Sequence, residues 1–233
     1  MLPEDHRAAF LAPYAARRPS ISLWTVSLGL SGPPATFGVD SYSTFILPPW
    51  LRTLGALREA SGILGEAPGA RLPPYVFVDY NRIDSGLNQA GPYLGSLCGT
   101  DRIENWRELS AEAKQARKTA WMDRLIADLD REFPGIAGAV IHREIATAET
   151  MAHYLNTPDG AVYGFAPERE GVNPLRMTAT TSIKGLWLAS AYVFGGGFTG
   201  AMVGGAVAAR ESIRATEAAT SAPSARNALG ALS

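Results

Sequence analysis

The residues whose types and spacing could support chemistry are glycines between residues 195 and 205. Gly195-x-Gly197-x-x-Gly200 matches the G-x-G-x-x-G pattern of dinucleotide-binding turns, with a predicted strand before it and a predicted helix after it. In such a turn glycine lets the backbone approach a phosphate closely, and the positive end of the helix favours an anion. That fingerprint, however, belongs to the first βα turn of a βαβ unit, whereas here one more helix and then a polar tail are expected. The position of the motif therefore speaks against its usual role.

The segment around these glycines carries no charged residue between Lys184 and Arg210. It is longer than the roughly 20 apolar residues that a membrane-spanning helix needs, and Gly200-x-x-x-Gly204 matches a helix-dimer motif. Gly195 to Gly197 interrupt the segment, because each glycine costs a helix about 1 kcal/mol relative to alanine. The pieces on either side are too short to span a bilayer, so the pattern favours a break over a transmembrane helix.

A third interpretation is a buried strand over 185–192, a glycine turn and a helix that begins there. Free N–H groups and the positive helix end would then favour an anionic or electron-rich ligand. The same residues would equally suit a tight strand-to-helix turn, in which small residues allow close packing. The residues alone do not decide between a ligand site and a packing turn.

Other residues with chemical potential are scattered along the chain. Cys98 is a candidate redox thiol, although a lone cysteine on a strand is more often a small packing residue. His6, His142 and His153 are far apart and lack the spacing of zinc ligands, so no metal site is expected. Neither a G-x-S-x-G nucleophile elbow nor a P-loop occurs.

Four aromatic residues gather on predicted strands, namely Tyr75, Phe77, Tyr80 and Tyr93. They could line an apolar substrate channel, which would suit a polyene or another lipid. Core packing is the expected role for most of them.

The elements that must position these residues alternate in type. A helix is expected over 1–18, and strands are expected over 21–30, 75–80, 92–98 and 139–146. Shorter helices are expected over 50–64 and 148–155. The clearest helix runs over 111–133, with Ser110 as its N-cap and one apolar stripe of Met122, Leu125, Ile126, Leu129 and Phe133. The final helix is expected to end near Ile213, and the small and polar residues 214–233 to form a disordered tail.

The composition is that of a globular protein. The 233 residues are 46% hydrophobic and 18% charged, with a formal net charge of -1 and no strongly basic stretch, so nucleic acid is not an expected partner. A single cysteine excludes an internal disulfide and fits a reducing compartment. No basic region followed by an apolar core marks a signal peptide at the N-terminus. We therefore expect a cytoplasmic protein, with peripheral membrane association as a further expectation.

Three separated blocks carry a family resemblance. Ala161-Val-Tyr-Gly-Phe165 is followed by Gly185-Leu-Trp-Leu-Ala-Ser-Ala191 and then by Gly195-Gly-Gly-Phe-Thr-Gly-Ala201. In this order the blocks resemble the C-terminal segment of phytoene desaturases, carotenoid isomerases and retinol saturases, which are FAD-dependent oxidoreductases. Residues 20–150, mainly through strand 21–30 and Asp130-Arg-Glu-Phe-Pro134, look more loosely like the substrate domain of that family. Ser190 and Phe194 depart from the glycine and proline that many relatives have.

The resemblance implies an FAD fold in which the last strand and the glycine turn lie beside the flavin. It assigns flavin contacts to Ser190, Ala191, Gly196, Gly197, Phe198, Thr199 and Gly200. It also implies hydride transfer through FAD on an apolar, isoprenoid-like substrate, with no acid or base that stands out as catalytic.

The fold expected from the resemblance is α+β. A mixed-sheet substrate domain is expected over 19–183 after the helix of 1–18, and the last strand and helix of a Rossmann-like FAD domain over 184–213. The N-terminal dinucleotide-binding unit of such an enzyme is not found, so the chain alone is expected to bind FAD weakly or not at all. It would then be a truncated product or one subunit of a split flavoenzyme with a separate FAD-binding half. The alternatives are a non-catalytic interaction module and a small membrane protein anchored by 186–209.

Overall fold

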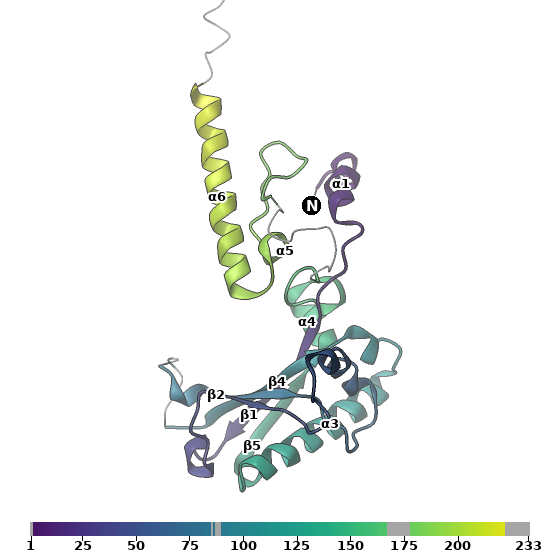
Figure 1. Cartoon of the computed structure of the whole chain (residues 1–233), viewed down its shortest axis with the longest axis vertical. Helices are drawn as coiled ribbons and strands as arrows, with labels where there is room; N and C mark the ends of the chain where they lie inside the picture. Colours follow the sequence, from purple (N-terminus) through teal and green to yellow (C-terminus); the bar gives the residue numbers. More distant parts are fainter. Residues whose placement is uncertain (1, 85, 87–89, 167–177, 222–233) are drawn as a thin grey trace, which may run out of the picture. The chain divides into compact units, whose positions relative to one another are not determined.

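The computed structural model describes residues 2–84, 86, 90–166 and 178–221 (Figure 1). They fall into two compact units. One comprises Ile21–Val162, and the other combines Met1–Ser20 with Tyr163–Ser233. Each unit is described by itself.

The unit of residues 21–162 is built on a five-stranded sheet in the order β2-β3-β4-β1-β5 (Figure 1). The strands are β1 Ser22–Leu30, β2 Ser43–Ile46, β3 Tyr75–Asp79, β4 Tyr93–Asp101 and β5 Val140–Ala146. The predicted α+β class is confirmed. The sheet, however, is antiparallel at every pairing and not mixed. The reason lies in the alternation of buried and half-buried residues along β1, β3 and β4, because strands with one packed face suit antiparallel sheets.

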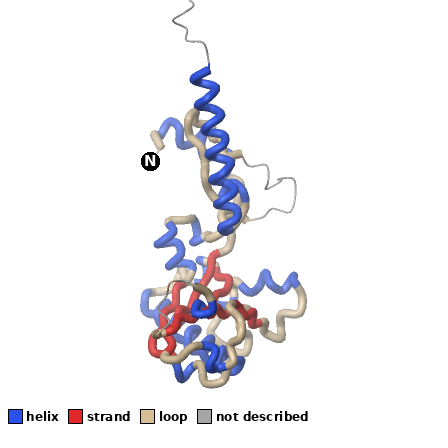
Figure 2. The backbone as a smooth tube through the Cα atoms, turned by 90° about the vertical axis from the view of Figure 1, so that its left-hand side faces the viewer, coloured by secondary structure: helices blue, strands red, loops and turns tan. Residues whose placement is uncertain are grey.

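The other unit is mainly helical (Figure 2). Its helices are α1 Glu4–Leu11, α5 Ala191–Phe194 and α6 Gly197–Ser221. The predicted strand over 185–192 is wrong, because this stretch makes a single bridge from Trp187 to Thr180 and then enters α5. A strand needs a paired neighbour, and among the described residues the stretch 185–192 makes only that bridge.

The last helix is longer than predicted, since α6 continues past Ile213 to Ser221. Polar residues of this stretch bond back to the helix: Thr216 Oγ1 donates to Ser212 O, and Thr220 Oγ1 donates to Thr216 O, both at 2.9 Å. The rest of the expected tail, 222–233, lies outside the described residues. Across the described helices, we find no stretch with the length and apolar character to cross a bilayer.

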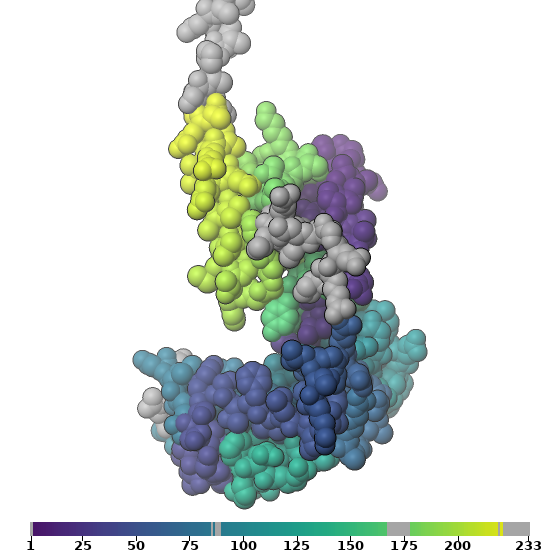
Figure 3. All heavy atoms as spheres, viewed as in Figure 1, coloured from purple at the N-terminus to yellow at the C-terminus, as the bar shows by residue number. Residues whose placement is uncertain are grey.

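The region between β1 and β3 departs most from the prediction. The expected helix over 50–64 is instead a 3₁₀ turn Leu54–Ala56, a short α2 Leu57–Ala60 and a second 3₁₀ turn Ile63–Gly65. Gly55, Gly62 and Gly65 make a continuous helix unfavourable. The short edge strand β2 was not predicted. Part of this region forms the dark blue surface turned to the viewer in Figure 3.

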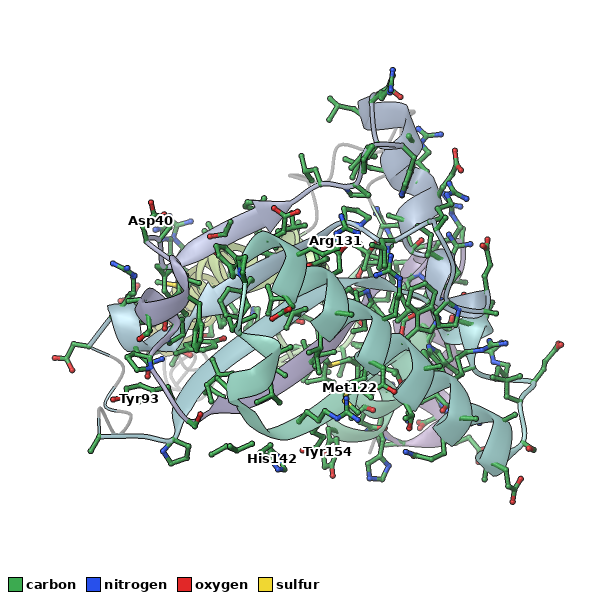
Figure 4. The ribbon with its side chains drawn as sticks, turned by 90° about the horizontal axis from the view of Figure 1, so that it is seen from below. Asp40, Tyr93, Met122, Arg131, His142 and Tyr154 are labelled. Carbon is green, nitrogen blue, oxygen red and sulfur yellow. The ribbon has the colours of Figure 1, made fainter. Side chains whose placement is uncertain are left out.

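The core lies between one face of the sheet and α3, Ala111–Glu132. From β1 it receives Trp24, Val26, Leu28 and Leu30, and from α3 it receives Trp121, Leu125 and Leu129, all fully buried. Ser110 Oγ accepts a hydrogen bond from Ala113 N at 3.2 Å, which confirms the predicted N-cap. Figure 4 shows α3, which carries Met122 and Arg131, lying across the sheet. The helix α4, Ala148–Leu155, follows β5 as predicted.

Candidate functional site

The glycine turn joins two helices. Ser190 caps the short α5, because its Oγ accepts a hydrogen bond from Tyr192 N at 3.2 Å. After Phe194 the chain passes through Gly195 and Gly197, whose φ angles of 102° and 77° lie in the left-handed region. Only glycine adopts this region without strain, so the reversal into α6 depends on these two residues.

Close packing accounts for other glycines of the motif. A Cβ added to Gly196 would lie 2.6 Å from Tyr163 Cβ, and one added to Gly204 would lie 2.7 Å from Ser190 O. A Cβ on Gly200 would overlap Gly195 O. The sequence left open whether these glycines serve a ligand or a tight turn. Close packing alone accounts for glycine at positions 196, 200 and 204.

The residues predicted to contact flavin lie on one continuous turn but differ in exposure. Gly196, Phe198 and Thr199 are exposed, with Phe198 at 92%, whereas Gly200 is buried in the packing against Gly195. Ser190, Ala191 and Gly197 are half-buried. Residues 196–199 are therefore at least partly exposed to solvent at the start of α6, whereas Gly200 is not. Their role as flavin contacts stays a prediction.

Electrostatically, this turn is the positive end of a long helix. The first N–H groups of α6 lack intrahelical partners, and the aligned peptide dipoles place partial positive charge there. In α5, which precedes the turn, the Tyr192 hydroxyl is buried and has no hydrogen-bond partner among the described residues. Burial raises the pKa of the Tyr192 hydroxyl above its ordinary value, so the group remains a hydrogen-bond donor.

Residues 163–165 complete the site, and residue-by-residue reasoning did not assign them to it. Tyr163 packs on Gly196, while a Cβ on Gly164 would lie 2.8 Å from Ala191 O. The ring of Phe165 meets that of Tyr192 edge-on, with centroids 4.9 Å apart. The three sequence blocks that carry the family resemblance therefore contact one another. The three blocks occur in the same order as in the family they resemble, and this order is the signal from which Tyr163 could have been assigned to the site.

The remaining candidate residues lie in the other unit or apart from the turn. Tyr75 and Phe77 belong to the core, as expected: Tyr75 Oη donates to Asp128 Oδ2 at 3.1 Å, and Phe77 packs on Phe133. Cys98 lies half-buried on β4, on the face opposite the core, and burial raises the pKa of its thiol. The described residues include no group of three or more His, Cys, Asp or Glu side chains that could hold a metal ion.

Comparison with known proteins gives matches over part of the chain. Over 135 residues the chain is 30% identical to a chloroplastic prolycopene isomerase of Daucus carota and to chloroplastic prolycopene isomerase 1 of an Oncidium hybrid cultivar. The chain is similar to prolycopene isomerases. The matched stretch is 54% of this chain, and 22% and 23% of those two proteins, so the chain spans less than a quarter of the length of these relatives. A chloroplastic prolycopene isomerase of Arabidopsis thaliana matches with the same identity. No family model matches the chain.

Proposed function

We propose that this chain supplies the substrate-domain region and the flavin-contacting turn of an FAD-dependent oxidoreductase that acts on an apolar, carotenoid-like substrate. The observation that carries the proposal is the similarity to prolycopene isomerases, which are carotenoid-converting enzymes by name. The mutual contact of residues 163–165, 190–192 and 196 supports it, because the blocks of the resemblance form one site. The proposal also includes a separate dinucleotide-binding half, which would hold the adenosine and pyrophosphate of FAD.

The start of α6 fits the flavin part of FAD on three counts. Gly196 and Gly197 carry no side chain that would block approach, and the helix end favours the negative charge that a reduced flavin develops. The partnerless hydroxyl of Tyr192 offers a hydrogen bond that no described residue uses. When bound, FAD supplies the hydride-transfer chemistry.

The residues of the chain hold and orient the cofactor in this proposal. Backbone N–H groups of Gly197, Phe198 and Thr199 would face the pyrimidine edge of the flavin, while Phe198 would cover its apolar surface. Gly195 and Tyr163 fix the turn, because the first supplies the left-handed backbone and the second packs on Gly196. Flavin binding at this turn would require small residues and a fixed backbone rather than particular side chains.

The open face of the sheet is the proposed wall for the apolar substrate. It is the face opposite the core and carries half-buried aliphatic side chains on three neighbouring strands: Val76 and Val78 on β3, Leu94 on β4 and Leu23 on β1. These aliphatic side chains would bind a polyene through apolar contact, while the same face becomes polar toward β5, where Glu144 pairs in register with Ser27. The aromatic residues Tyr75 and Phe77 lie on the opposite, core face and are not part of this wall.

An apolar stripe on α6 is the proposed contact for the separate half. Phe198, Met202 and Ile213 are 92%, 75% and 56% exposed and recur at helical spacing along one side. An exposed stripe of this kind on a helix marks an interaction surface. A dinucleotide-binding half would bury it and complete the flavin site.

The test is flavin absorbance of the purified chain with FAD, alone and after co-expression with the N-terminal part of the Daucus carota relative. The chain alone should bind little FAD, and the complemented pair should carry flavin bands and convert prolycopene. Gly197→Val should abolish flavin binding by the pair. Gly185→Val is the matched control, because Gly185 has a similar φ of 85° but lies outside the turn.

Stoichiometric FAD on the chain alone would overturn the split arrangement while leaving the flavin turn in place. Absence of flavin in both settings would favour the alternative function, a non-catalytic interaction module. The observation behind that alternative is the packing that explains Gly196, Gly200 and Gly204 without a ligand.

A further inference from the structure

A pocket of about 680 Å³ lies in the unit that contains α6, between the segment 180–187 and the helix residues 211–216. Both walls belong to this one unit, and the segment lies beside α6 in Figure 1, where it is drawn in light green. The volume falls within the range of pockets that bind small organic molecules. None of the residues predicted to contact flavin lines this pocket, so it is a separate candidate site.

Hydrogen bonds within the unit fix the two walls of the pocket. Thr180 Oγ1 donates to Glu211 Oε2 at 2.6 Å, which joins the segment to α6. Thr181 closes the segment on itself, because its Oγ1 donates to Leu186 O at 2.9 Å. A bridge from Thr180 to Trp187 pairs the two ends of the segment. The chain itself therefore holds both walls in place, which lowers the ordering cost of binding a ligand there.

Apolar side chains supply one part of the lining. Ile183, Leu186 and Trp187 all line the pocket, and each of them is half-buried. Part of their apolar surface therefore still faces water. A ligand with an apolar body would cover this surface and release that water, which favours binding.

Charged side chains supply another part of the lining. Lys184 and Arg214 are exposed at the pocket, and neither forms an ion pair with any described residue. Glu211 also lines the pocket, but its carboxylate already accepts the hydroxyl of Thr180. The two cations outnumber the one carboxylate, so the pocket favours an anion. A guanidinium binds carboxylate or phosphate through two parallel hydrogen bonds.

We propose that this pocket binds a small organic anion, which has an apolar body and a single carboxylate or phosphate head. The body contacts Ile183, Leu186 and Trp187, and the head lies at Lys184 and Arg214. Both parts of the ligand are needed, because an exposed ion pair alone contributes little free energy. The inference goes beyond the proposed flavin chemistry and does not rest on it.

The test is calorimetric titration of the full chain with decanoate, decyl phosphate and decan-1-ol, each below its micelle-forming concentration. At least one of the two anions should bind, and the tighter of them identifies the head. Decan-1-ol should bind about tenfold more weakly, because it lacks the charge that the two cations recognise. Acetate and inorganic phosphate should bind more weakly still, because they lack the apolar body.

Tryptophan fluorescence places the bound ligand in this unit. Trp187 is the only tryptophan outside residues 21–162, and it lines the pocket. The better anion should change the emission of the wild-type chain, and Trp187→Phe should remove most of that change. An unaltered fluorescence response in Trp187→Phe would place the ligand elsewhere and overturn the inference.

Charge variants test the head of the ligand. Lys184→Gln and Arg214→Gln should each weaken binding of the anion about threefold, and together about tenfold. Glu211→Gln should instead tighten binding about threefold, because the amide oxygen still accepts from Thr180 while the repelling charge is gone. Arg7→Gln is the matched control and should bind like the wild type. It removes the same charge from an exposed position on α1 in the same unit, away from the pocket lining.

Circular dichroism on every variant separates lost binding from misfolding. The inference is overturned if neither anion binds, if decan-1-ol binds as tightly as the anions, or if the double variant binds like the wild type. Weaker binding by Glu211→Gln would overturn it in favour of a cation. Displacement of the anion by FAD would assign the pocket to the cofactor instead. Failure of the chain to bind FAD would leave the anion binding as it is, so the two proposals are tested separately.

Discussion

The indole Nε1 of Trp106 donates a hydrogen bond of 2.8 Å to Asp101 Oδ2, and both residues are fully buried. Asp101 also accepts from Asn105 Nδ2 at 2.7 Å and from the backbone N–H groups of Arg102 and Ala148, each at 2.8 Å. One carboxylate at the end of β4 therefore ties the following 3₁₀ turn to the first residue of α4. Burial is the largest influence on this carboxyl and raises its pKa, against the lowering effect of the four donors.

Asp101→Asn should lower the free energy of unfolding by about 3 kcal/mol. The new amide N–H would face the buried N–H groups that now donate to the Asp101 carboxylate, and those groups would lose an acceptor. Urea unfolding measures the change. Asp123→Asn is the control, since Asp123 forms an exposed ion pair with Arg143 and its loss should cost under about 1 kcal/mol. Equal effects for the two variants would contradict the buried network.

Two neighbouring glycines of α6 should respond to alanine with opposite signs. Gly205→Ala should stabilise the helix by about 0.5–1 kcal/mol, because alanine is the better helix former and nothing lies within 4 Å of the new Cβ. Gly204→Ala should instead cost about 1–3 kcal/mol, because its Cβ would lie 2.7 Å from Ser190 O. Thermal unfolding followed at 222 nm distinguishes them. Stabilisation by both would show that α5 and α6 do not pack as described.

The Cys98 thiol should react with a disulfide reagent more slowly in the folded chain than in urea, because burial raises its pKa and lowers the thiolate fraction. The same shift makes stability depend on pH. The unfolded thiol ionises first, near its ordinary pKa of about 8.5, so the free energy of unfolding should fall as pH rises from there toward the folded pKa. Cys98→Ser should lack this part of the decline. A rate equal to that of the unfolded chain would contradict the burial.

Tyr75→Phe should lower the free energy of unfolding by about 1–2 kcal/mol, because the buried Asp128 loses the hydrogen bond from the Tyr75 hydroxyl. Burial, followed by the charge of Asp128, raises the pKa of Tyr75 far above its ordinary value. Ultraviolet titration of the wild type should therefore show one tyrosine that ionises only as the protein unfolds. Tyr154→Phe is the control, since that ring is 80% exposed and its change should stay within about 0.5 kcal/mol.

Local patterns were enough to predict most of the sheet unit. The alternation in 21–30 and the stripe from Met122 to Phe133 predicted β1 and α3 because one face of each is buried in the core. The short β2 escaped notice, since its Phe45 is exposed and leaves no apolar alternation to detect. The helix over 50–64 failed because the glycines there favour separate turns.

The glycine turn shows where sequence reasoning ended. The glycine breaks were visible in the sequence, but the apolar residues 185–192 predicted a strand. Pairing partners decide whether a strand forms, and among the described residues this stretch makes one bridge. The contacts of Tyr163 with Gly196 and of Gly164 with Ala191 join residues about thirty positions apart, which no local pattern encodes.

The strand order has a consequence for synthesis on the ribosome. The interior strand β1 is made first, yet Val26 pairs with Leu97 on one side and Ile145 on the other. Its hydrogen-bonding edges must therefore wait for β4 and then for β5, and loop closure over such separations slows folding. Until Ala146 has been synthesised, the nascent chain holds an apolar strand with an open edge, which is a state that chaperones recognise and that favours aggregation. Synthesis of this protein should therefore depend on chaperone supply more strongly than its small size suggests.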